Sequence, residues 1–124
     1  MKPKNQIISL ALIALLVAAL CGCGGGGEKF GDAITTVETT KVGDILARPD
    51  DFTGKTVKIE GEIARECPTG CWLDLKDETG VTYVDLGPSG FAIPQKVGSK
   101  ITIEGKVLKR PERTMIIGKG VEIQ

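Results

Sequence analysis

The chain has 124 residues, room for one domain, and it contains 16 basic and 16 acidic residues but no histidine. The lack of histidine removes the commonest metal ligand and general base. The balanced charge argues against a protein that binds nucleic acid through a basic excess.

The first 22 residues have the pattern of an export signal. Lys2 and Lys4 precede residues 7–20, which are apolar apart from Ser9. This apolar run is too short for a confident membrane span and fits the core of a signal peptide. The alternative interpretation is an N-terminal membrane anchor that is never cleaved.

The end of this segment, Leu20-Cys21-Gly22-Cys23, resembles a bacterial lipobox, from which Cys21 departs only mildly. The resemblance implies cleavage before Cys23, lipidation of its sulfur, and a further acyl chain such as palmitate on its amine. More than one acyl chain gives stable anchoring. The expected location is therefore outside the cytoplasm, with the protein lipid-anchored to a bacterial membrane. Removal of Lys2 and Lys4 with the signal leaves 14 basic and 16 acidic residues, a charge of −2.

Residues 23–40 are expected to form the lipidated N-terminus and a flexible tether, because four glycines follow Cys23 directly. Residues 41–124 form the expected domain.

A short helix over residues 42–48 opens this domain. Val42, Ile45 and Leu46 recur at helical spacing and would share one face. Thr40 is the expected cap of this helix, and Pro49 is expected to end it.

Five short strands follow, because apolar and polar residues alternate with a period of two. They are expected at residues 56–65, 72–76, 81–86, 100–107 and 114–123, the last broken by two glycines. Gly61 and Gly105 occupy matching positions in two similar strands, where a barrel strand bends sharply. The predicted fold is all-β: a small closed barrel of five strands preceded by a short helix.

The two remaining cysteines, Cys67 and Cys71, enclose Pro68-Thr69-Gly70. A three-residue hairpin loop favours proline early and glycine last, in the left-handed region. Such a loop would hold the two Cα atoms roughly 4.5–5.5 Å apart, a separation that a disulfide tolerates. A structural disulfide is the favoured interpretation, and a metal or redox pair and free thiols are its alternatives. No metal site and no cofactor is predicted, because a structural zinc needs four ligands.

The only tryptophan, Trp72, follows this loop. Alternation places Trp72 and Asp74 on the side of the strand opposite Leu73 and Leu75. An aromatic residue on a barrel face is suited to stacking bases or sugar rings, and Tyr83 is a further candidate whose facing is undetermined. The last hairpin adds candidate contacts to an anionic polymer or lipid headgroup: Lys109, Arg110 and Arg113. The alternatives are an ordinary rim aromatic and a solvated hairpin tip.

Residues 57–63 resemble the first strand of an OB-fold, and residues 98–107 resemble its fourth. Gly70-Cys71-Trp72, with Cys67 before it, is similar to the signature of a family of exported bacterial OB-fold proteins of unknown function. This resemblance implies the fold and an exported location, but no established activity.

No nucleophile–base pair and no phosphate-binding loop is found in the sequence, so the protein is not expected to be an enzyme. The predicted function is a non-catalytic binding or interaction module of the bacterial cell envelope, held at the membrane, with an unknown protein, glycan or small-molecule ligand. Two alternatives remain: thiol or metal handling by Cys67 and Cys71, and nucleic-acid or oligosaccharide binding on the barrel face. Nucleic acid is the less favoured partner, since the fold alone does not establish it.

Overall fold

The computed structural model describes residues 27–124. The predicted signal peptide at residues 1–22 and the predicted lipidation at Cys23 lie outside the described residues. Within residues 27–124, none of the helices has the length and apolar character needed to cross a membrane.

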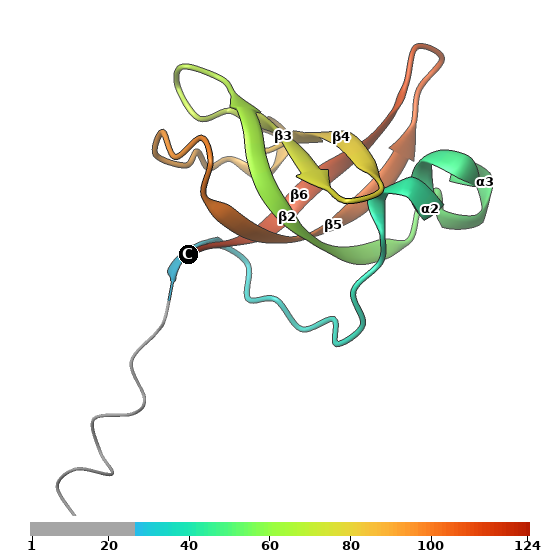
Figure 1. Ribbon diagram of the computed structural model, residues 1–124, viewed down its shortest axis with the longest axis horizontal. Coiled ribbons are helices and arrows are strands. Elements are labelled where there is room, and N and C mark those ends of the chain that lie inside the picture. The colour runs from blue at the N-terminus through green and yellow to red at the C-terminus, as the bar shows by residue number, and fades with distance from the viewer. Residues whose placement is uncertain (1–26) are drawn as a thin grey trace, which may run out of the picture.

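The described chain forms strands joined by short loops, with helices near its N-terminal end (Figure 1). In chain order the elements are β1 (Glu28–Gly31), α2 (Val42–Ala47), α3 (Pro49–Phe52), β2 (Thr56–Glu66), β3 (Trp72–Asp77), β4 (Gly80–Asp85), the short 3₁₀ helix η2 (Gly87–Ser89), β5 (Lys100–Lys109) and β6 (Thr114–Ile123). The predicted helix and the five predicted strands are confirmed, in the predicted order.

The strands close into a barrel. The sheet has the order β1-β6-β4-β3-β2-β5, and β5 also pairs with β6, which joins the two sides of the sheet. The pairings are antiparallel except for β4 with β6, which run parallel. The predicted all-β fold, a closed barrel of five strands, is therefore confirmed, with β1 as an additional short strand at its edge.

Period-two alternation puts the apolar residues inside the barrel. In β2, for example, Val57, Ile59 and Ile63 are buried, while Glu60 and Glu62 are exposed. Burying a large aliphatic side chain stabilises a fold by roughly 1.5–3 kcal/mol. The largest fully buried side chains come from all five barrel strands, from α2 and from the residue after β4: Val42, Ile45, Ile59, Ile63, Leu73, Leu75, Val84, Leu86, Ile103, Val107, Ile116 and Ile123.

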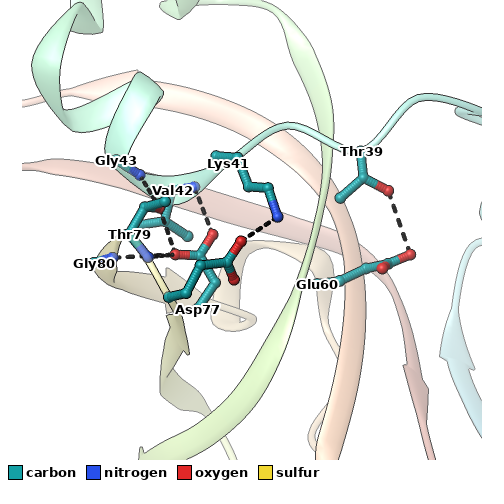
Figure 2. A network of polar contacts seen from close by, with 9 residues as sticks. Thr39, Lys41, Val42, Gly43, Glu60, Asp77, Thr79 and Gly80 are labelled. Atoms are coloured by element: carbon teal, nitrogen blue, oxygen red, sulfur yellow. Dashed lines mark hydrogen bonds and ion pairs between the residues drawn. The ribbon is translucent and has the colours of Figure 1, made fainter.

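Helix α2 packs Val42 and Ile45 into this core, but its expected cap at Thr40 is wrong. Lys41 occupies the cap position, and its side chain makes no capping hydrogen bond. The first helical N–H groups donate instead to the β3–β4 turn: Val42 to Asp77 Oδ2 at 2.8 Å and Gly43 to Thr79 Oγ1 at 2.7 Å (Figure 2). Residues distant in sequence thus satisfy donors that the helix cannot satisfy itself.

Pro49 follows the end of α2, as expected, and it also begins a second helix. Arg48, with φ −135° and ψ 60°, leaves helical geometry as a residue before proline should. The chain then enters α3 with Pro49 in its first turn, where the missing proline N–H costs no hydrogen bond.

Residues 28–40, expected to continue the tether, are instead held against the barrel. Strand β1 pairs antiparallel with the end of β6, from Glu28 opposite Ile123 to Gly31 opposite Gly120. Further along, the N–H groups of Thr35 and Thr36 donate to Glu104 Oε2 at 2.9 and 2.6 Å. This segment is ordered because its backbone N–H groups find acceptors on β5 and β6. These hydrogen bonds offset the conformational entropy lost when the segment is ordered.

Both glycines expected at strand bends lie where two backbones approach closely, since a Cβ atom on Gly105 would lie 2.4 Å from Ile117 O. Gly105 adjoins an irregularity in the β5–β6 register and faces Gly118. Gly61 pairs regularly with Ile101, but a Cβ atom added to it would lie 2.2 Å from the carbonyl oxygen of Lys76. Gly61 is therefore needed because two backbones approach closely there, rather than because the strand is bulged.

Candidate functional site

Four side chains from neighbouring elements stack across the outside of the barrel. The Trp72 and Tyr83 rings are stacked, with centroids 5.4 Å apart and planes at 30°. The Arg65 Cζ atom lies 5.6 Å from the Trp72 ring centroid, and the Arg113 Cζ atom lies 3.8 Å from that of Tyr83. We call Arg65, Trp72, Tyr83 and Arg113 the stacked row.

Strand register brings these side chains together. Arg65 on β2 lies opposite Asp74 on β3, and Asp74 lies opposite Tyr83 on β4. Trp72 precedes Asp74 by two residues, so it points to the same side of β3. Trp72 therefore has Arg65 on its β2 side and Tyr83 on its β4 side, and Arg113 follows beyond Tyr83.

Sequence reasoning missed Arg65. Ile63 faces the core, and strict alternation would turn Arg65, two residues later, inward as well. The register of β2 against β3 shifts between these two residues, and this bulge turns Arg65 to the outside, as bulges do. The residue type could have indicated that Arg65 faces outward, because an arginine is almost never fully buried without a partner.

Asp74 neutralises one of the two arginines in the stacked row, Arg65. The Asp74 side chain is 11% exposed, and its Oδ2 atom accepts a hydrogen bond from Arg65 Nε at 2.7 Å. Beside it, burial raises the pKa of the Tyr83 hydroxyl, the Asp85 charge raises it further, and the Arg113 charge partly offsets both effects. Tyr83 therefore stays protonated and neutral across the physiological pH range.

The structure thus places four sequence candidates in one cluster, namely Trp72, Asp74, Tyr83 and Arg113. Lys109 lies apart from the row, because its Nζ atom pairs with Asp50 of α3 at 2.8 Å. Arg110 shares a tight turn with Arg113: Arg110 N–H donates to Arg113 O at 2.9 Å, and Arg113 N–H donates to Arg110 O at 3.3 Å.

The cysteine loop borders the other end of the row. Cys67 and Cys71 form the predicted disulfide, with Cα atoms 5.6 Å apart, and Gly70 has the predicted left-handed conformation at φ 72°. The loop is one residue longer than expected, since Cys67 N–H donates to Trp72 O at 2.9 Å and Cys71 stays within the loop. The disulfide therefore closes the loop from which Trp72 emerges.

This loop is also tied to the connector between β4 and β5. Gly70 O accepts the Ile93 N–H at 3.2 Å, and Gln95 Nε2 donates to Cys67 O at 2.6 Å. A Cβ atom on Gly70 would lie 1.9 Å from Ile93 O, so the two segments touch through their backbones.

We expect the disulfide to be structural. The double replacement Cys67→Ser and Cys71→Ser should lower the free energy of unfolding by roughly 2 kcal/mol, because the chain-entropy contribution of so small a loop is of this size. Urea unfolding with and without a reducing agent measures it. Reduced protein that gains stability on adding stoichiometric zinc or copper(I) would contradict this role, as would a bond that glutathione opens readily.

A separate pocket of about 430 Å³ lies away from the row. It is lined by Glu60, Gly61, Glu62, Lys76, Asp77, Glu78 and Lys100. Asp77 already accepts hydrogen bonds from α2 and its own turn, and Glu78 is paired with Lys41. Within residues 27–124, no group of three histidine, cysteine, aspartate or glutamate side chains is placed to hold a metal ion. We therefore place the candidate site at the stacked row.

Comparison with known proteins shows the fold. No family model matches the sequence, and no curated protein sequence matches it. Among solved structures, the hypothetical protein ygiW from E. coli is similar at 18% identity and a TM-score of 0.57, over 77% of this chain and 99% of that protein.

Two other solved structures share the barrel. Asparaginyl-tRNA synthetase from Pyrococcus horikoshii matches at 16% identity and a TM-score of 0.57, over 71% of this chain but only 23% of the synthetase. An OBody bound to hen egg-white lysozyme matches at 15% identity and a TM-score of 0.56, over 74% of this chain and 96% of the OBody. The barrel is therefore an OB-fold.

Proposed function

We propose that this protein is a non-catalytic OB-fold binding module and that the stacked row is its ligand-binding surface. OB-folds bind ligands on the face of their second and third strands, between the first and fourth loops of the barrel. In this chain those strands are β3 and β4, and those loops are residues 67–71 and 110–113. Figure 1 shows the two loops projecting at opposite ends of this pair of strands.

The observation that carries the proposal is the aromatic pair. Trp72 and Tyr83 come from adjacent strands, stack at 5.4 Å, and are both half-buried on the outer face of the barrel. A barrel needs no aromatic residues on its outer face for stability, whereas ring-containing ligands stack on such platforms with a gain of roughly 1–3 kcal/mol per ring. A glycan is the favoured ligand, because a charge of −2 after signal removal does not favour the polyphosphate backbone of nucleic acid.

A protein partner is the second candidate. The OBody in the comparison is bound to a protein, lysozyme, and tryptophan, tyrosine and arginine are the residues that most often dominate protein–protein contacts. The stacked row contains these three residue types.

The proposal includes attachment to a bacterial membrane through lipidated Cys23. Strand β1 begins at Glu28, so four glycines separate Cys23 from the barrel. Replacement Cys23→Ala should release the domain from membranes or block its processing, as fractionation and intact mass would report. Unchanged processing together with full membrane retention would overturn this part of the proposal.

The binding surface can be tested through Trp72, the only tryptophan of the chain. We expect glycan fragments to change its fluorescence on titration, and we expect Tyr83→Ala, which keeps the reporter, to weaken binding about tenfold or more. Val37→Ala is the matched control, because Val37 is an apolar residue 87% exposed outside the row.

An oligo-dT strand and short peptides titrated in the same way assign the ligand class. A ligand that binds without changing Trp72 emission, and equally well to the Tyr83→Ala variant, would place the site elsewhere.

A further inference from the structure

Positive charge is distributed unevenly along the stacked row. At the end near the cysteine loop, Arg65 is neutralised by Asp74 at 2.7 Å. At the other end, neither Arg110 nor Arg113 makes an ion pair with any residue in the described part of the chain. The nearby Lys109 differs, since Asp50 neutralises it. Only one end of the row therefore carries uncompensated charge.

The turn brings the two uncompensated arginines together. Arg110 and Arg113 exchange both backbone hydrogen bonds across Pro111-Glu112, so they form a directly opposite, hydrogen-bonded pair. Side chains of such a pair point to the same face of a hairpin, and like charges placed there repel each other. An anion between the two guanidinium groups would turn this repulsion into attraction.

Arg113 is also oriented by its contact with Tyr83. Its Cζ atom lies 3.8 Å from the ring centroid, a cation–π contact that holds the guanidinium over Tyr83. The guanidinium has five N–H donors, and those not directed at Tyr83 are suited to binding a carboxylate or phosphate. Arg65 differs, because Asp74 already holds its Nε atom.

We infer that Arg110 and Arg113 form an anion subsite at one end of the stacked row, and that the ligand carries a carboxylate or phosphate there and an uncharged ring at the Trp72 end. This inference rests on the proposed function of the row. It adds that binding is directional, since only one end of the surface selects for negative charge.

The subsite can be tested with a matched pair of sugars. Cellobiuronate, a glucuronate linked to an uncharged glucose, and its methyl ester share their rings and differ in one charge, which lies at one end. We expect the wild type to prefer the acid by about tenfold, and Arg110→Gln to reduce this preference to about threefold or less, because Arg113 remains. Arg48→Gln is the control, because Arg48 is exposed beyond α2 and far from the row in sequence. Equal affinity for acid and ester in the wild type would overturn the inference and leave the proposed function standing.

Nuclear magnetic resonance of the arginine Nε–H groups tests the subsite independently of the aromatic surface. Titration with inorganic phosphate and, separately, with galacturonate should shift the signals of Arg110 and Arg113 and leave those of Arg48 and Arg65 in place. The anion that gives the lower dissociation constant identifies phosphate or carboxylate as the preferred group. Shifts at these two arginines without any change in Trp72 emission on titration with sugars, peptides or oligo-dT would keep the subsite and reject the stacked row as the binding surface. No shift at either arginine would reject the subsite.

Discussion

Replacing Gly61 with valine is expected to lower the free energy of unfolding by more than about 3 kcal/mol. A Cβ atom at this position would lie 2.2 Å from Lys76 O, 2.8 Å from Lys76 C and 2.9 Å from a methyl group of Leu75. Two of these atoms belong to backbone, which cannot move without breaking the pairing of β2 with β3. Overpacking alone costs roughly 1–3 kcal/mol, and the strand shift adds to it.

The measurement is urea unfolding of the Gly61→Val variant beside a matched glycine variant. Gly80→Ala is suitable, because its Cβ atom would meet its nearest neighbours, Leu46 and Val42 side-chain carbons, at ordinary distances of 3.5 and 3.6 Å. We expect this control to unfold close to the wild type. A Gly61→Val variant with an unchanged midpoint would show that β2 and β3 do not approach as described.

Replacing Asp77 with alanine is expected to cost about 2–4 kcal/mol. One carboxylate oxygen accepts the Val42 N–H at the start of α2, and the other accepts N–H groups of Thr79 and Gly80 at 2.7 and 3.1 Å. Figure 2 shows this convergence of donors on Asp77. A lost helix cap costs roughly 0.5–2 kcal/mol, and hydrogen bonds to a charged group contribute about 1.5–3 kcal/mol each.

The pH dependence separates the charge of Asp77 from its shape. Burial acts to raise the pKa of this carboxyl, but the hydrogen bonds from Thr79, Val42 and Gly80 outweigh it and hold the pKa below the ordinary value of 3.8. A carboxyl with a lowered pKa stabilises the fold above its unfolded pKa, and the contribution disappears as pH falls through the folded value.

Asp77→Asn keeps the shape and one acceptor oxygen but does not titrate. We therefore expect it to be less stable than the wild type at pH 7 and to approach it at about pH 3. Thermal unfolding at the two pH values measures the difference. A constant gap between the two proteins would mean that the charge of Asp77 contributes nothing.

Local patterns were enough to predict the barrel. The alternation of apolar and polar residues is clear in β2, where Val57, Ile59 and Ile63 are buried. It is not clear in β4, where Val81 is exposed and Thr82 is buried, which is why the facing of Tyr83 was undetermined. The disulfide followed in the same way, because Pro68 and Gly70 encode a loop that brings Cys67 and Cys71 together.

The facing of the site residues could be predicted only where side chains alternate regularly along a strand. Trp72 and Asp74 share a side of β3 because no irregularity intervenes. Arg65 could not be placed, since its facing depends on a bulge that is set by pairing with β3. The contact of Arg113 with Tyr83 depends in turn on β4 lying beside β6, a parallel pairing between strands far apart in the sequence.

Long-range polar contacts were missed for the same reason. Asp77 caps a helix that begins 35 residues earlier, and Glu104 binds N–H groups 68 and 69 residues away. No local sequence signal reports such a partner. Thr40 was the natural local choice for a cap, and it is not used because the β3–β4 turn supplies stronger acceptors.

Strand β6 pairs with three others, namely β1, β4 and β5. These pairings include the join between the N-terminal strand and the last residues of the chain, Glu28 opposite Ile123. A chain that emerges from the ribosome or from a membrane pore with its N-terminus first can form the β2–β3–β4 meander early, because those contacts are local. It cannot close the barrel until the ten residues of β6, Thr114–Ile123, are free. Native folding therefore waits for β6, and deletion of residues 120–123 would leave β1 and the start of β5 with exposed, unpaired edges that invite aggregation.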